Sequence, residues 1–147
     1  MIEIRPAVPA DLDTFHRYES EPEGRRRAGF PERDRETFLN HWNTKIFAVP
    51  ENDAQAVVVD GEVAGNIVCW PQDGRRMVGY WYGERFWGRG IGSKALAMYL
   101  ERMTVRPLYA DTVEGNVGSI RVLERCGFTR IDSGEEGMAL FVLGASE

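Results

Sequence analysis

The sequence predicts one α/β domain over residues 1–147, built on a mixed and mostly antiparallel sheet of about six to seven strands flanked by about four helices. Composition is the first observation: 147 residues that are 43% hydrophobic and 28% charged suit one packed domain. Second, apolar segments joined by tight-turn residues fill the first half of the chain, which indicates hairpins. Third, strand and helix patterns alternate in the second half, without an internal repeat or linker.

The first third of the chain predicts a short strand and two helices. Residues 2–5 alternate apolar and polar side chains, which is typical of a strand. A helix is expected from Pro9, and a second around residues 38–42. Between them, residues 19–34 hold two prolines and two glycines, so we expect irregular structure there. The arginine run 25–27 is predicted to face solvent.

The middle of the chain predicts antiparallel strands. A strand is expected over residues 46–49. The apolar segments 56–59 and 63–70 flank Asp-Gly at 60–61, a dipeptide that favours the positive φ angles of a tight hairpin turn. A further turn then leads into an aromatic-rich strand over residues 77–82.

The last third predicts alternating strands and helices. From Ser93 the apolar residues recur at helical spacing until Pro107 ends the helix. A second helix is expected over residues 116–126, with Gly127 in the left-handed position past its end. Strands are expected over residues 108–113, 129–131 and 138–143.

Charge and cysteine content narrow the function. The net charge of −5 argues against broad nucleic-acid binding and favours a cationic substrate such as a protonated amine. No signal-peptide pattern or stretch of eighteen apolar residues occurs, so we expect a cytoplasmic protein without a membrane partner. Cys69 and Cys126 lack metal-ligand spacing and are expected to be buried free thiols, and no metal is expected. The sequence leaves the oligomeric state open, a homodimer included.

A glycine-rich loop between the aromatic strand and the next helix is the main functional pattern. Glycines at alternate positions let successive N–H groups converge on one anion at a helix N-terminus, where the helix dipole adds favourable potential. Three basic residues bracket this loop in an otherwise acidic chain, which suits a ligand with several phosphate groups. The glycines are Gly88, Gly90 and Gly92, and the basic residues are Arg85, Arg89 and Lys94.

Other phosphate loops fit less well. A dinucleotide-binding fingerprint would need glycine where Ser93 or Ala95 stands, although alanine sometimes occupies that last position. A Walker loop would need Gly-Lys-Ser/Thr, which Ser93-Lys94-Ala95 does not supply. Glycines that merely permit a tight strand-to-helix connection are the remaining alternative.

The segment Glu84 to Leu96 resembles the signature of the GNAT superfamily of acetyl-CoA-dependent N-acetyltransferases, Gln/Arg-x-x-Gly-x-Gly/Ala. The segment Asn116 to Phe128 resembles the second landmark of that family, a helix that starts at asparagine and ends in Gly-Phe. The resemblance spans the element order of the whole chain, and residues 80–128 match at motif level. Trp87 stands where the signature has Gln or Arg. This substitution, with Ser119 one helical turn after Asn116, is similar to the subgroup of ribosomal-protein N-terminal alanine and serine acetyltransferases, and also to many small-molecule relatives.

The resemblance implies a GNAT-like fold and a set of residues for acetyl-CoA as co-substrate. The strand backbone would bind the pantetheine arm, the loop amides the pyrophosphate, and the asparagine the pantetheine. The implied residues are Tyr80, Trp81, Tyr82, Trp87, Gly88, Arg89, Gly90, Ile91, Gly92, Ser93 and Asn116. Core packing by the strand aromatics and a helix cap by Asn116 are the alternatives.

The catalytic groups are less well defined. Many relatives have a tyrosine as general acid in the second helix, where this chain has Leu123. The resemblance implies Ser119 as the acid or as the partner of a positioned water. The candidates for the base are Glu84, Asp111 and Glu114, each of which could instead be a surface or capping carboxylate. His16 and His41 lie in the first two predicted helices, and we expect structural roles for both.

The function that follows is an N-acetyltransferase moving an acetyl group from acetyl-CoA to a primary amine, on a peptide N-terminus or a small molecule, by direct attack. The alternative is a non-catalytic acyl-CoA-binding module that retains the loop and has lost the acid and the base. A nucleotide-binding switch is a third hypothesis, which has only the glycine loop in its favour.

Overall fold

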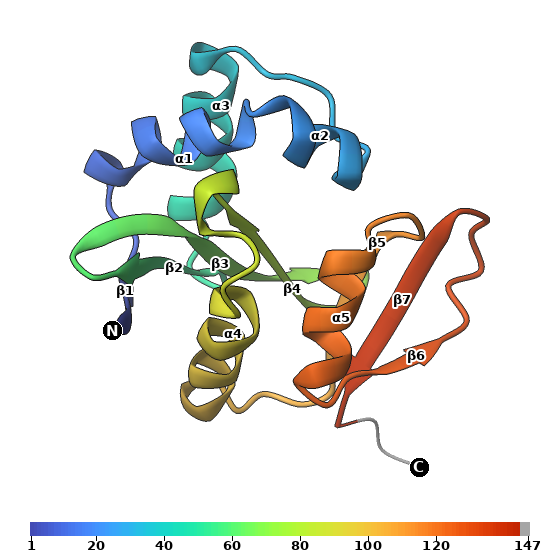
Figure 1. The fold of residues 1–147 in the computed structure, drawn as a ribbon. Coiled ribbons are helices and arrows are strands. Elements are labelled where there is room, and N and C mark those ends of the chain that lie inside the picture. The colour runs from blue at the N-terminus through green and yellow to red at the C-terminus, as the bar shows by residue number, and fades with distance from the viewer. Residues whose placement is uncertain (145–147) are drawn as a thin grey trace.

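The computed structural model describes residues 1–144, which form one seven-stranded sheet with helices on both faces (Figure 1). The strand order is β1-β2-β3-β4-β5-β7-β6, and only the β4–β5 pair is parallel among the described strands. This arrangement confirms the predicted fold class, with five α-helices instead of four. The predicted domain's last three residues, 145–147, lie outside the described residues.

The strands are β1 (Ile2–Pro6), β2 (Asp53–Val59), β3 (Glu62–Gln72), β4 (Arg75–Tyr82), β5 (Leu108–Val113), β6 (Thr129–Ile131) and β7 (Met138–Leu143). The α-helices are α1 (Leu12–Glu19), α2 (Pro22–Ala28), α3 (Arg35–His41), α4 (Ile91–Arg102) and α5 (Val117–Arg125).

The first four strands form consecutive hairpins. The turn between β2 and β3 has φ angles of 50° at Asp60 and 84° at Gly61, and the turn between β3 and β4 has 52° at Asp73 and 77° at Gly74. Positive φ at both central residues matches the twist of the flanking strands, which is why Asp-Gly is favoured at both places. Both predicted turns are confirmed.

Two predictions in the N-terminal third were wrong. Residues 19–34 contain helix α2, in which Pro22 occupies the first turn and Gly29 adopts the left-handed position after the last. These residues mark the ends of a helix and do not break one, because proline is tolerated at the start and glycine favoured past the end. Residues 46–49 are not a strand: the chain continues from α3 into a π-helical turn, Trp42–Phe47.

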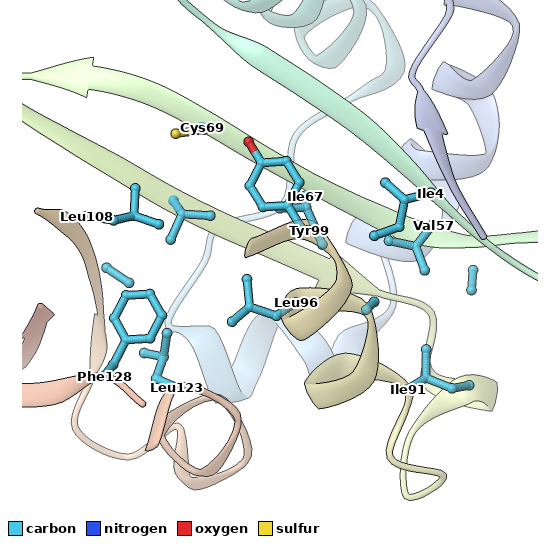
Figure 2. Close-up of a cluster of buried hydrophobic side chains, with 14 of the residues drawn as sticks. Ile4, Val57, Ile67, Cys69, Ile91, Leu96, Tyr99, Leu108, Leu123 and Phe128 are labelled. Atoms are coloured by element: carbon cyan, nitrogen blue, oxygen red, sulfur yellow. The ribbon is translucent and has the colours of Figure 1, made fainter. Parts of the chain in front are cut away.

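Helices α4 and α5 lie on one face of the sheet, and α1 to α3 lie on the other (Figure 1). Figure 2 shows Leu96 and Tyr99 of α4 and Leu123 of α5 directed at the sheet, where Ile67 and Leu108 are fully buried. A smaller cluster, which includes Phe15 of α1 and Phe38 of α3, packs on the opposite face. Within residues 1–144, no helix combines the length and the apolarity that crossing a membrane requires.

Candidate active site

The sheet opens between β4 and β5. These parallel strands pair only at Arg76 with Leu108 and at Met77 with Tyr109, whereas β4 pairs with β3 through eight residue pairs. Beyond Met77 the strands diverge, and a cavity of about 710 Å³ occupies the opening. This volume lies within the usual range for small-molecule sites, roughly 300–1,000 Å³.

The cavity reaches both faces of the sheet. On the α4/α5 face its walls include the glycine loop, the start of α4 and one side of α5, and on the other face they include one side of α2. Residues of α2 in the wall are Gly24, Arg27 and Ala28, followed by Phe30. Those of the loop, α4 and α5 include Gly88, Gly90, Ile91, Gly92, Ser93, Gly118, Ser119, Arg121, Val122, Leu123 and Arg125, with Asn116 just before α5.

The backbone of β4 presents unused groups to this opening. The Gly83 N–H donates to the Ala64 carbonyl of β3, so the peptide groups of Tyr82 and Tyr80, at alternate positions, point toward the opening. The Tyr82 carbonyl accepts a hydrogen bond from Trp87 Nε1 at 3.2 Å. The Tyr80 peptide is therefore the one best placed to bond a ligand at this edge.

The glycine loop needs its glycines for two different reasons. Gly88 and Gly90 both have φ of 75°, a conformation that L side chains rarely adopt. A Cβ at Gly92 would lie 3.3 Å from Val122 Cγ2, so this glycine lets α4 approach α5 closely. The amides of Ile91, Gly92 and Ser93 belong to the first turn of α4, where no helical carbonyl satisfies them. They are free to bind an anion.

The basic residues around the loop are partly different from those predicted. Arg85 is turned away, in an exposed ion pair with Glu62 at 3.0 Å. Arg121 and Arg125 of α5 line the cavity, and sequence reasoning missed both. Their spacing of four residues on the helix that starts at Asn116 was the available signal, because residues four apart share a helix face.

Asn116 and Ser119 lie together at the start of α5. Asn116 caps the helix, its Oδ1 accepting from the Ser119 N–H at 3.4 Å, and both residues line the cavity. The Tyr80 hydroxyl donates to the Ser119 carbonyl at 3.1 Å and lies 3.0 Å from Ser119 Oγ. Burial raises the pKa of Tyr80, so its phenol stays protonated at neutral pH. Leu123 is 1% exposed and has no proton to give.

A second tyrosine carries an unsatisfied hydroxyl. Tyr82 lines the cavity, and within residues 1–144 its buried hydroxyl has no hydrogen-bond partner. A buried polar group without a partner is costly, so a bound ligand or water that bonded it would remove an unfavourable contribution. Together with the first-turn amides of α4 and the free edge of β4, this fits a long ligand with both polar and anionic groups.

Helix α2 forms the opposite wall with two tryptophans. The Arg27 guanidinium stacks 4.6 Å from the Trp87 ring while its side chain stays exposed. Arg26 and Arg27 face solvent as predicted, and Arg25 is partly buried. The Trp81 indole donates to the Tyr18 carbonyl at 3.2 Å and packs against Phe30, with the ring centroids 5.7 Å apart. A Cβ at Gly24 would lie 3.1 Å from the Trp81 ring, so this glycine permits the contact.

Of the three candidate carboxylates, only Asp111 lines the cavity. Glu114 forms an exposed ion pair with Arg130 at 2.7 Å, and Glu84 is exposed outside the cavity wall. Asp111 is exposed as a residue, but partial desolvation of its carboxyl by the surrounding walls raises the pKa, and the charge of Glu135 raises it further. Asp111 is thus the candidate base that the geometry retains.

The histidines and cysteines lie outside the cavity wall. His16 Nε2 is 2.8 Å from the Arg33 carbonyl, and burial lowers the pKa of His41. Both cysteines are free: Cys69 is buried, and Cys126, partly buried, donates to the Ser93 carbonyl. Among residues 1–144 no cluster of three or more His, Cys, Asp or Glu residues could hold a metal ion.

A sheet opened between two parallel strands, with a glycine loop and a helix N-terminus beside the opening, defines the acyl-CoA N-acyltransferase class. The family model described as "Acetyltransferase (GNAT) domain" matches residues 2–129. The chain belongs to this family, which confirms the resemblance noted in the sequence, and it is an acetyl-CoA-dependent N-acetyltransferase.

Solved structures share the fold at low sequence identity. The aminoglycoside acetyltransferase AAC(6')-Ib in complex with coenzyme A has a TM-score of 0.83 and 17% identity over 98% of this chain and 95% of its own. An acetyltransferase from Thermus thermophilus has 0.81 and 21% over 97% and 96%. RimL, a ribosomal L7/L12 α-N-protein acetyltransferase in complex with coenzyme A, has 0.76 and 20% over 97% and 93%. No curated protein sequence matches the chain significantly.

Proposed function

We propose that this chain acetylates a primary amine, on a peptide N-terminus or a small molecule, by direct attack of the amine on acetyl-CoA bound between β4 and β5. The observation that carries the proposal is the cavity that passes through the sheet, because it admits the two substrates from opposite faces. The catalytic unit is the single domain predicted over residues 1–147.

On the α4/α5 face, the chain's own groups suit each part of coenzyme A. The glycine loop and the first-turn amides of α4 would hold the pyrophosphate, and Arg121 and Arg125 add positive charge to the same wall. The Tyr80 peptide and Asn116 would bond the pantetheine amides. Of the residues assigned from the sequence, Trp81 and Trp87 would act on the opposite face, since both pack against α2.

Ser119 is the proposed partner of the leaving thiolate. Transfer requires a polarised thioester carbonyl, an unprotonated amine and a thiolate able to leave, and a thiol with a pKa near about 8.5 leaves with little help. The Tyr80 phenol lies 3.0 Å from Ser119 Oγ, where either hydroxyl can donate. With Tyr80 as the donor, the Ser119 hydroxyl is left to donate to the departing sulfur directly or through a water. Tyr80 on β4 and Ser119 on α5 would thus take the role of the tyrosine that many relatives have at the position of Leu123.

The acceptor follows from the subgroup resemblance and from the neighbours. RimL is named for a ribosomal protein acceptor and AAC(6')-Ib for aminoglycosides, so both a peptide amine and a small amine are candidates. We propose the cytoplasm as the place of action, without a nucleic-acid or membrane partner; gel filtration would decide between a monomer and a homodimer.

The experiment measures release of the coenzyme A thiol from acetyl-CoA with a panel of amines: peptides starting with alanine or serine, an aminoglycoside, and benzylamine. Release above the hydrolytic background that depends on the amine is the expected result. Tight acetyl-CoA binding without amine-dependent release would favour the non-catalytic module. Thermal stabilisation by ATP or NAD, without any by coenzyme A, would favour the nucleotide-binding switch.

A further inference from the structure

Asp111 lies on β5 just beyond the last residue that pairs with β4. It is the first residue beyond that pair whose side chain is on the α2 face of the sheet. Met77 pairs with Tyr109, so continuing the register sets Gly79 across the opening from Asp111. Side chains alternate along a strand, and Ala110 is buried in the core on the α4/α5 face. Asp111 therefore lies on the other face. A Cβ at Gly29, the residue after α2, would contact Val113, which shares that face with Asp111.

The space opposite the carboxylate is left open by β4. Gly79 has no side chain, and a Cβ there would lie 3.2 Å from the Trp70 ring, so a larger residue would not fit without moving that ring. The apolar wall beside this space comes from Trp81, Phe30 and Met138, all of which line the same cavity. The result is one carboxylate at the mouth of the opening, set among aromatic and apolar surfaces.

Few charged groups surround Asp111. On β7 its paired neighbour is the apolar Leu140, and β4 contributes Gly79 and Trp81 across the opening. Further along β4, the Arg75 guanidinium stacks 4.6 Å from the Tyr109 ring, two residues before Asp111. Glu135, in the loop between β6 and β7, is the nearby like charge. Arg27 of α2 lines the cavity, but it is paired with Glu23 and stacked on Trp87. Within residues 1–144, Asp111 has no ion-pair partner.

The geometry points to Asp111 as the general base of the reaction, and to an acceptor whose primary amine is a protonated alkylammonium joined to an apolar or planar group. This inference rests on the function proposed above and names the acceptor class for the same site. The Asp111 carboxylate supplies the negative charge that pairs with the ammonium of the acceptor. The aromatic wall contacts the carbon atoms next to that ammonium.

The protons balance between the site and solvent. One proton passes from the ammonium to an Asp111 carboxylate oxygen, and the freed nitrogen lone pair attacks the thioester carbonyl carbon. The C–N bond forms, the C–S bond breaks, and the thiolate takes a proton through Ser119 or water. The amide nitrogen loses its second proton to solvent, and Asp111, which is solvent-exposed at the cavity wall, releases the proton that it took. The products are the amide, coenzyme A and one net proton.

The test compares benzylamine with O-benzylhydroxylamine, which share a ring but differ in basicity: the first is protonated at pH 7 and the second is largely neutral. For Asp111→Asn we expect kcat/KM to fall about 10²- to 10⁴-fold with benzylamine, the usual range for a lost general base, and less than about fivefold with O-benzylhydroxylamine. In the variant, kcat/KM with benzylamine should rise with pH as the free-amine fraction rises, and the inflection set by the Asp111 carboxyl should be absent. Coenzyme A affinity should not change.

Glu114→Gln is the matched control, because this carboxylate lies three residues further along the chain and is paired with Arg130 on the surface. It should leave both kcat/KM values unchanged. Equal losses for the two amines, or no loss in Asp111→Asn, would overturn the assignment, as would a wild-type enzyme that acetylates neither. Absence of amine-dependent thiol release with every amine tested would instead refute the proposed function itself. A variant that no longer binds coenzyme A would show that Asp111 supports the fold and not the proton transfer.

Discussion

Strand β4 is paired with β3 along all of its eight residues and with β5 along only two. On the β3 side, backbone hydrogen bonds and tight turns complete the sheet, and polar side chains such as Asp11 have partners. On the β5 side, peptide groups, helix-start amides and the Asp111 carboxylate face a cavity. The β3 edge of β4 therefore serves the stability of the sheet, and the β5 edge serves ligand binding. Polar groups without partners occur at the β5 edge because strand pairing stops there.

The largest effect should come from removing the backbone freedom of the glycine loop. Gly90 and Gly74 have nearly the same φ, 75° and 77°, and neither is crowded, so valine at either position carries a similar strain of about 1–3 kcal/mol. We expect Gly90→Val to weaken coenzyme A binding at least about 100-fold, the equivalent of about 2.7 kcal/mol, by tilting the α4 amides. Calorimetric titration measures it.

Gly74→Val is the control for strain, since it lies in the β3–β4 turn. It should lower the melting temperature comparably and leave the coenzyme A dissociation constant unchanged. A loss of coenzyme A binding in both variants would mean that the β3 edge of β4 also affects binding, which would contradict the comparison of the two edges.

An intermediate effect is expected from the Tyr80–Ser119 pair. Tyr80→Phe and Ser119→Ala should each lower kcat about 10- to 100-fold with little change in KM for acetyl-CoA, and the double variant should be no worse than Ser119→Ala, because the two hydroxyls act as one unit. Tyr18→Phe removes a comparable buried hydrogen bond, to the Val63 carbonyl, on the hairpin side. It should cost about 1 kcal/mol of stability and leave kcat intact. Fully additive losses in kcat would separate Tyr80 from Ser119.

The smallest effects concern stability, and they should have opposite signs for two aspartates. Asp11 accepts two hydrogen bonds from Arg5, which hold its pKa below the usual value, so its stabilisation is present above about pH 4 and is lost as pH falls through the lowered pKa. Asp11→Asn should cost about 2 kcal/mol at pH 7. The Asp111 pKa is raised, so its charge opposes folding once pH rises through that pKa.

Asp111→Asn should therefore raise the free energy of unfolding slightly at pH 7 and leave it unchanged well below pH 4. Urea unfolding of both variants at pH 3 and pH 7 measures the two signs. Destabilisation by Asp111→Asn at pH 7 would mean that this carboxylate has a structural partner after all.

The local elements were largely predictable because their causes are local. Asp60-Gly61 selects its turn by backbone sterics, and the apolar spacing after Ser93 is helical in any environment. The wrong prediction for residues 19–34 arose because residue type alone does not decide whether a helix forms there. Proline and glycine at the ends of α2 look alike whether they break a helix or delimit one, and the difference depends on Glu23 pairing with Arg26 and Arg27 and on Trp81 packing beneath Gly24.

By itself, the sequence determined the fold class, the strand and helix order of the second half, and the acetyl-CoA family, since turn chemistry, periodicity and the two motifs are encoded within short segments. Only the tertiary structure decided which groups share the cavity. Tyr80 meets Ser119 across 39 residues, and Asp111 is distinguished from Glu84 and Glu114 by where the β4–β5 ladder ends. Such contacts depend on strand register and helix packing, which no short segment specifies.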